Sequence, residues 1–204
     1  MKLYLNKLSP NVRRVLLTAA AAGIELEEKP LDFAKGEHKS PEYLAVNPNG
    51  AVPALVDGDF VLTESRAIMQ YLAAKKPDSK LFPTDAAECA DVTRWQFWDS
   101  SHFSPNAATL AFERVLKPMM GMGEPDAAKI SDALTNWRRF AAVLDKRLAG
   151  RTFVVGSSLT IADLTLAASL MYAKQADLPV AEFPNVAAWF GRMTELPAWK
   201  KLTS

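Results

Sequence analysis

The chain has 204 residues, of which 49% are hydrophobic and 23% are charged, a balance typical of a folded globular protein and not of a disordered or fibrous one. Its 24 Lys and Arg against 23 Asp and Glu leave a formal net charge of +1, which excludes an overall electrostatic attraction to nucleic acid or to an anionic membrane. The single cysteine excludes an intrachain disulfide and a cysteine-based zinc site, and the two histidines lack the spacing of a metal-binding pair.

Hydropathy along the chain argues against export and membrane insertion. No stretch has the length and hydrophobicity of a membrane span, and residues 1–14 lack the apolar core of a secretory signal. We therefore expect a cytoplasmic protein with no membrane partner, no nucleic-acid partner and no metal site.

The first 75 residues alternate strand-like and helix-like segments. Short apolar runs predict strands, Ala- and Leu-rich or capped segments predict helices, and Asp57-Gly58 is a hairpin signal. In chain order the predicted elements are a strand at 3–5, a helix at 12–23, a strand at 26–31, a helix from Ser40-Pro41, strands at 52–56 and 60–62, and a helix at 64–74. This order indicates a small α/β unit with a mixed sheet.

A polar, proline-punctuated stretch over residues 77–85 is typical of a linker, and the chain beyond it is helical. Helices are predicted at 85–115, 126–148, 159–176 and 185–193. Thr160 and Asp163 have the spacing of a capping box at the start of the third of these helices. We predict an α/β domain over residues 1–76 and an all-helical domain over residues 86–204.

Ser9 lies between the first predicted strand and the first helix, so its hydroxyl and the unpaired N–H groups of that helix face the same loop. That arrangement suits an anion. Serine before proline is also a common helix cap, and the local sequence leaves both interpretations open. Because no histidine base lies nearby in sequence, a hydrogen-bonding role is favoured over nucleophilic attack.

Three further segments combine polar groups with a turn or a helix start. Val52-Pro53 marks a strand start or a sheet edge, because proline cannot join a central ladder. Glu64-Ser65 opens a helix whose N-terminus is suited to a carboxylate. His38-Lys39 is a short cationic pair in a loop. Taken singly, each also fits an ordinary loop, a capped helix or solvated surface.

In this order and spacing, the motifs resemble those of the cytosolic glutathione transferases over essentially the whole chain, closest to the phi class and its bacterial relatives. The resemblance is carried by the segments 9–17, 36–44, 47–55 and 57–68 and by the Thr160–Asp163 box. It implies a thioredoxin-like N-terminal domain, an all-helical C-terminal domain and a homodimer. It also implies glutathione as a co-substrate, with no permanently bound cofactor.

The resemblance implies roles for individual residues. Ser9 matches the serine that hydrogen-bonds the glutathione sulfur. The residues implied to hold the rest of glutathione are His38 and Lys39 at the glycine carboxylate, Val52 with a cis Pro53 at the cysteinyl unit, and Glu64 and Ser65 at the γ-glutamyl end. Ala51 stands where the phi pattern usually has glutamine, which removes one contact to the peptide.

The activity implied is conjugation of the glutathione thiolate to small hydrophobic electrophiles, a detoxification reaction. Candidates to line the electrophile pocket are Phe103, Phe112, Leu116 and Met119, although apolar residues at helical spacing more often belong to a core. Asn11 keeps a second activity open, since an asparagine in this position approaches the sulfur in a nu-like branch of glutathione-dependent peroxidases and disulfide reductases. A third alternative is a non-catalytic glutathione- or ligand-binding protein.

Overall fold

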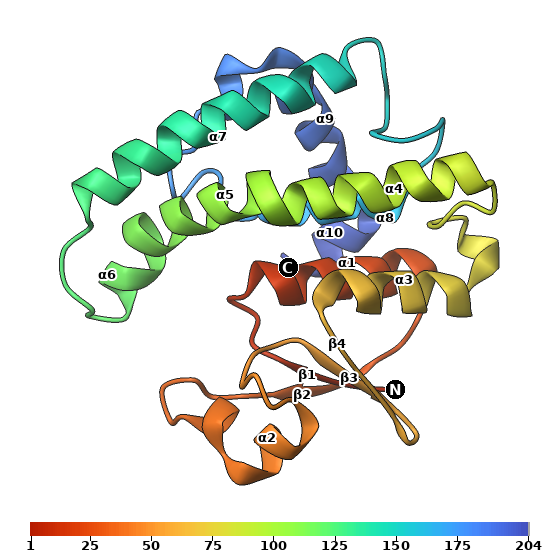
Figure 1. Cartoon of the computed structure of the whole chain (residues 1–204), viewed down its shortest axis with the longest axis vertical. Helices are drawn as coiled ribbons and strands as arrows, with labels where there is room; N and C mark the ends of the chain where they lie inside the picture. Colours follow the sequence, from red (N-terminus) through yellow and green to blue (C-terminus); the bar gives the residue numbers. More distant parts are fainter. Residues whose placement is uncertain (204) are drawn as a thin grey trace. The chain divides into compact units, whose positions relative to one another are not determined.

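The computed structural model describes residues 1–203, which divide into two compact units (Figure 1). The first unit contains Met1–Phe82 together with the C-terminal segment from Pro197, and the second contains Pro83–Leu196. The division between Phe82 and Pro83 falls inside the stretch predicted to be a linker.

The first unit is built on a four-stranded mixed sheet. Its strands, in the spatial order β2-β1-β3-β4, are β2 (Glu27–Pro30), β1 (Lys2–Leu5), β3 (Ala54–Asp57) and β4 (Phe60–Thr63). β1 is parallel to β2 and antiparallel to β3, while β3 and β4 form the predicted hairpin around Asp57-Gly58. The parallel pair requires a crossover, and the helix α1 (Pro10–Ala22) provides it.

Two helices cover one face of this sheet, and a short one lies on the other side (Figure 1). α1 packs against α3 (Ser65–Lys75), and the short helix is α2 (Pro41–Val46). Gly23 ends α1 in the left-handed conformation, and the Ser40 hydroxyl accepts a hydrogen bond from the Tyr43 N–H at 3.2 Å, as predicted for a helix cap. The completely buried side chains of this core include Leu3, Leu5, Val12, Val15, Leu55, Ile68 and Leu72.

The C-terminal segment, predicted as the end of a helical domain over residues 86–204, clusters with the first unit. The helix α10 (Pro197–Lys201) packs against α1 and so belongs to the first unit. Arg13 Nη1 donates to the Leu202 carbonyl at 3.1 Å, and its guanidinium lies 5.8 Å from the centre of the Trp199 ring. The first of these contacts joins residues 189 positions apart, so no local pattern in the sequence indicates it.

The second unit is helical. Its helices are α4 (Ala86–Trp98), α5 (Ser104–Ala111), α6 (Lys117–Met119), α7 (Ala127–Leu148), α8 (Ile161–Ser169) and α9 (Pro184–Glu195). The predicted helix at 85–115 is present as α4 and α5, joined by a π-helical turn at Asp99–Phe103 and followed by a second one at Phe112–Leu116. α8 ends at Ser169, before the predicted end at residue 176. Among the described residues, none of the helices combines the length and apolar character needed to span a membrane.

Candidate functional site

A cavity of about 200 Å³ in the first unit is lined by residues from three of the segments singled out in the N-terminal sequence. The residues that line it are Asn11, Asn47, Asn49, Ala51, Val52, Pro53, Glu64 and Ser65. They come from the first turn of α1, the loop that leads into β3, and the start of α3. Segments that are far apart in sequence therefore form one site.

The loop that leads into β3 is held by hydrogen bonds to its own backbone. The Ala51 carbonyl accepts from Tyr43 Oη at 2.5 Å and from Asn47 Nδ2 at 2.6 Å. Burial raises the pKa of the Tyr43 phenol above its ordinary value, so the phenol keeps the proton that it donates. The Val52-Pro53 peptide bond that follows is cis, as the family resemblance implies.

Gly50 brings a second segment against this loop. Its φ of 58° lies in the left-handed region, and a Cβ at this position would lie 3.0 Å from the His38 carbonyl oxygen. Only glycine allows this approach without displacing backbone. The backbone of His38 therefore lies beside the loop that lines the cavity.

His38 and Lys39 themselves are not among the residues that line the cavity. His38 is half-buried in the short 3₁₀ turn Glu37–Lys39, where its ring stacks on Phe33 with 4.1 Å between the ring centres. Within the described chain, the buried His38 Nδ1 has no hydrogen-bond partner. Lys39 is exposed. Their assignment to the glycine carboxylate stays a prediction.

The start of α3 supplies Glu64 and Ser65 to the cavity lining. Glu64 precedes the helix with a φ of 66°, an uncommon conformation for a non-glycine residue and one that is found disproportionately at functional sites. The Glu64 side chain makes no capping hydrogen bond to α3, whose N-terminus, like that of any helix, carries N–H groups without an acceptor inside the helix. The Ser65 side chain is buried beside them.

Asn11 lies on the first turn of α1, and its side chain links α1 to α3 by a hydrogen bond. Its Oδ1 accepts a hydrogen bond from Arg14 Nη1 and lies 3.4 Å from the hydroxyl of Ser65. Sequence reasoning gave no role to Arg14, nor to the cavity-lining Asn47 and Asn49. The N-P-N-G pattern signalled a turn at these two asparagines. No local pattern indicates that Arg14 is buried or that it bonds the side chain of Asn11.

Ser9 precedes α1, and its backbone carbonyl accepts from the Arg13 N–H at 3.0 Å. In the described residues its side chain makes no capping hydrogen bond, so the capping interpretation of this serine is not supported. The hydroxyl is therefore left for another partner. Ser9 is not among the residues that line the cavity, and its role at the sulfur stays a prediction.

The candidates for an electrophile pocket do not share one environment. Phe103 is completely buried and packs between the rings of Trp98, at 5.8 Å, and Trp137, at 5.7 Å, so it belongs to the core of the helical unit. Phe112 and Met119 are exposed, at 36% and 58% of their surface. Leu116, at the end of the second π-helical turn, is half-buried.

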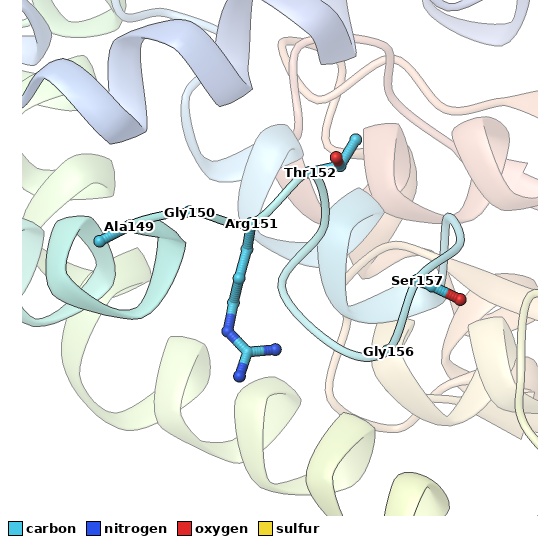
Figure 2. A pocket seen from close by; sticks show the side chains of 6 residues that line it. All are labelled: Ala149, Gly150, Arg151, Thr152, Gly156 and Ser157. Atoms are coloured by element: carbon cyan, nitrogen blue, oxygen red, sulfur yellow. The ribbon is translucent and has the colours of Figure 1, made fainter.

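A larger cavity in the second unit, of about 480 Å³, does not have the character of a site. Figure 2 shows the side chains of Arg151, Thr152 and Ser157 pointing away from one another, so their polar groups do not converge on a common ligand. Within residues 1–203, no three His, Cys, Asp or Glu side chains gather closely enough to hold a metal ion.

The fold and this site define a two-domain protein in which a thioredoxin-like unit carries a polar ligand cavity and a second unit is all-helical. A family model for the glutathione S-transferase N-terminal domain matches residues 1–74, and one for the C-terminal domain matches residues 103–197. Glutathione S-transferase 3 of Zea mays is 38% identical over 98% of this chain and 92% of its own length. A probable glutathione S-transferase of Oryza sativa subsp. japonica is 36% identical over 100% and 96%.

Solved structures agree with these relatives. Glutathione transferase F2 from Populus trichocarpa superposes with a TM-score of 0.92 at 30% identity, over 99% of this chain and 96% of that one. Glutathione S-transferase I bound with lactoylglutathione has a TM-score of 0.90 at 32% identity, over 98% and 97%. The chain belongs to the glutathione S-transferase family and is a transferase. Its resemblance to the phi class is confirmed by these plant relatives.

Proposed function

We propose that the protein conjugates the thiolate of glutathione to small hydrophobic electrophiles. The observation that carries the proposal is the cavity of about 200 Å³ with a helix N-terminus and a buried hydroxyl at one wall and a cis-proline loop at another. One related structure is described as bound with lactoylglutathione and another as a complex with an atrazine glutathione conjugate. Both ligands contain glutathione.

The chemistry of the cavity suits the parts of glutathione. Glu64 is an acidic partner for the α-amino group, and the Ser65 hydroxyl with the N–H groups of α3 suits the α-carboxylate. The backbone of Val52 is the partner for the cysteinyl unit. His38 and Lys39 complete the set at the glycine carboxylate. With Ala51 in place of the family's glutamine, the peptide makes one side-chain contact fewer.

Thiolate formation sets the energetic requirement. A thiol has a reference pKa of about 8.5, and lowering it by about two units takes about 2.7 kcal/mol of preferential stabilisation of the thiolate. A charge-assisted hydrogen bond contributes about 1.5–3 kcal/mol, and the N-terminus of α1 adds to it. The free hydroxyl of Ser9 is the proposed donor, with Asn11 as a second one.

The test is ultraviolet difference spectroscopy of the glutathione complex against pH, combined with conjugation of an aryl halide. We expect thiolate absorbance at neutral pH in the wild type. Ser9→Ala should lower kcat by about tenfold or more while changing KM for glutathione far less, because the hydrogen bond strengthens as the thiolate forms. Glutathione binding without thiolate absorbance would instead indicate a non-catalytic binding protein.

A second candidate function is glutathione-dependent reduction of peroxides or small disulfides. The observation that favours it is that Asn11 lines the cavity whereas Ser9 does not. Activity with a hydroperoxide or a small disulfide, but not with an aryl halide, would select this function. If Ser9→Ala keeps full conjugation activity and Asn11→Ala loses it, the group that stabilises the glutathione thiolate is Asn11.

The setting of the enzyme is part of the same proposal. We propose a cytoplasmic homodimer that acts in detoxification, with glutathione and a hydrophobic electrophile as its partners and no permanently bound cofactor. The family membership and the net charge of +1 support this setting. Sedimentation equilibrium tests the dimer, and a mass equal to one chain would contradict it.

A further inference from the structure

We infer that Arg14 is a positioning residue that orients the carboxamide of Asn11, so that the –NH₂ group of Asn11, and not its oxygen, faces the sulfur of bound glutathione. The inference rests on the proposed function, since it concerns the ligand of the same cavity. It gives a role to the buried guanidinium of Arg14, which has none in the function proposed above.

The first step is the burial of Arg14. Its side chain is 0% exposed, and its Nη1 donates a hydrogen bond to Asn11 Oδ1. The two residues stand three positions apart in α1, a spacing that puts side chains on the same face of a helix. A guanidinium carries only donors, so the carboxamide atom that faces it must be the oxygen. The identity of Arg14 thereby fixes which way the amide of Asn11 is turned.

The second step concerns the same oxygen from the side of α3. The Ser65 hydroxyl lies 3.4 Å from Asn11 Oδ1, so two donors converge on this atom. Among the residues described, the –NH₂ group of Asn11 has no hydrogen-bond partner, and Asn11 is an exposed side chain that lines the cavity. The free donors of the carboxamide are therefore available to a ligand in the cavity.

The third step is the chemical consequence. An amide N–H is a donor and stabilises a thiolate, whereas an amide oxygen beside the same sulfur would repel it. Turning the carboxamide over would place –NH₂ against the buried guanidinium, where water cannot replace the lost acceptor. When the Ser65 hydroxyl turns to the carboxylate of glutathione, Arg14 becomes the remaining anchor of this orientation.

A double-mutant cycle tests the inference, with the pKa of the bound glutathione thiol as the readout. Arg14→Lys keeps the positive charge but removes the Nη1 atom that donates to Asn11 Oδ1, while Asn11→Ala removes the carboxamide. We expect each single variant to raise the thiol pKa by about one unit, an approximately tenfold loss of thiolate below the pKa. In the Asn11→Ala background, Arg14→Lys should change the pKa no further, because its effect passes through Asn11.

Arg13→Lys is the matched control, since Arg13 is the next residue on the helix and its side chain contacts Leu202 and Trp199 instead. It should leave the thiol pKa unchanged. Equal effects of Arg14→Lys with and without Asn11 would overturn the inference, because Arg14 would then act through its field or through folding. If Arg14→Lys does not fold, Asn11→Asp takes its place: it keeps an acceptor for Arg14 but loses the donor, and a wild-type thiol pKa in that variant would overturn the inference.

Failure of the inference is distinguishable from failure of the proposed function. Thiolate absorbance in the wild type, with an additive cycle, overturns only the role of Arg14. Absence of glutathione binding or of thiolate in the wild type overturns the proposed function and the inference with it.

Discussion

At the scale of single residues, Gly50 shows how a backbone position shapes the cavity. Its left-handed conformation lets the loop before β3 approach the His38 carbonyl, and a methyl group there would lie 3.0 Å from that oxygen. Gly58 in the β3–β4 turn has a similar φ of 62°, but no atom lies within 4 Å of the corresponding Cβ position. Substituting each glycine in turn therefore distinguishes the free-energy cost of a left-handed backbone from the cost of the close contact with His38.

We predict that Gly58→Ala lowers the free energy of unfolding by about 1–2 kcal/mol, the usual cost of a left-handed non-glycine residue. Gly50→Ala should cost about 1 kcal/mol more, since backbone must also move. Only Gly50→Ala should weaken glutathione binding, by several-fold. Denaturant titration and calorimetric binding measure the two effects, and equal losses in both variants would contradict a role for the contact with His38.

Glu113 is a buried carboxylate that ties the second π-helical turn to the start of α7. Its Oε2 accepts from Lys117 Nζ at 2.8 Å and from the Asp126 N–H at 2.9 Å. The hydrogen bond from Lys117, followed by that from Asp126, holds the pKa of Glu113 below its ordinary value of 4.5. The carboxylate thereby fixes both ends of the segment that contains α6.

The direction of this pKa shift determines a pH dependence. Because the folded state binds the proton less readily than the unfolded state, the stabilisation from Glu113 is complete above about pH 4.5 and is lost as the pH falls through the folded pKa. We predict that Glu113→Gln is less stable than the wild type at neutral pH and that the difference shrinks below pH 4.5. Urea titrations across this range measure it, and a difference that grows on acidification would refute the assignment.

The candidate residues of the cavity could be found from the sequence only in part. Val52, Pro53, Glu64 and Ser65 stood out because each belongs to a recognisable turn or helix start, whereas Asn11 stood out only through the family resemblance. The structure brings these residues together. Arg14 could not be found, because its burial depends on tertiary packing. Without knowledge of the packing, a charged residue on a helix is predicted to be exposed to solvent.

At the scale of elements, the start of α8 shows which part of a capping motif is local. The Asp163 carboxylate accepts from the Thr160 N–H at 3.1 Å, which confirms the predicted capping box. It also accepts from the Val154 N–H at 2.9 Å and from Trp189 Nε1 at 3.0 Å. These two bonds join α8 to the loop before it and to α9. Burial raises the pKa of Asp163, against these hydrogen bonds, which lower it.

We predict that Asp163→Ala lowers the free energy of unfolding by about 3 kcal/mol or more, since it removes a cap worth about 1 kcal/mol and leaves buried donors unpaired at about 1–3 kcal/mol each. Thr160→Ala is the comparison, because it removes only the local part and should cost about 1 kcal/mol. Denaturant titration of both variants measures the difference. Equal losses would show that the bonds to Val154 and Trp189 add nothing.

The bounds of α7 were predicted closely, whereas the end of α8 was not. Asp126 caps α7 by accepting from the Ala128 and Lys129 N–H groups at 3.0 and 3.1 Å, and the predicted helix at 126–148 matches the observed one almost to the residue. A cap is a local hydrogen bond and leaves a sequence signature. The end of α8 at Ser169 has no such signature, since the apolar pattern continues past it.

At the scale of the whole molecule, the order of elements and the two-part organisation could be predicted, but the composition of each part could not. The pattern change after residue 75 marks a boundary because strand and helix periodicities differ. The cavity depends on the packing of α1 against α3, which brings residue 11 beside residue 65. The packing of α1 against α3 brings together motifs that, taken singly, do not indicate a ligand site. Only the order of these motifs along the chain predicted the site.

The docking of α10 on α1 has a consequence for the biosynthesis of the protein. Residues 197–203 are the last of the described residues to be translated, yet they belong with Met1–Phe82, the first to emerge. During synthesis of the second unit, Trp199 and Leu202 are not yet present. The surface of α1 that they later contact is therefore not yet covered. Most of the first unit is thus translated before the second unit, but its last helix is translated after it.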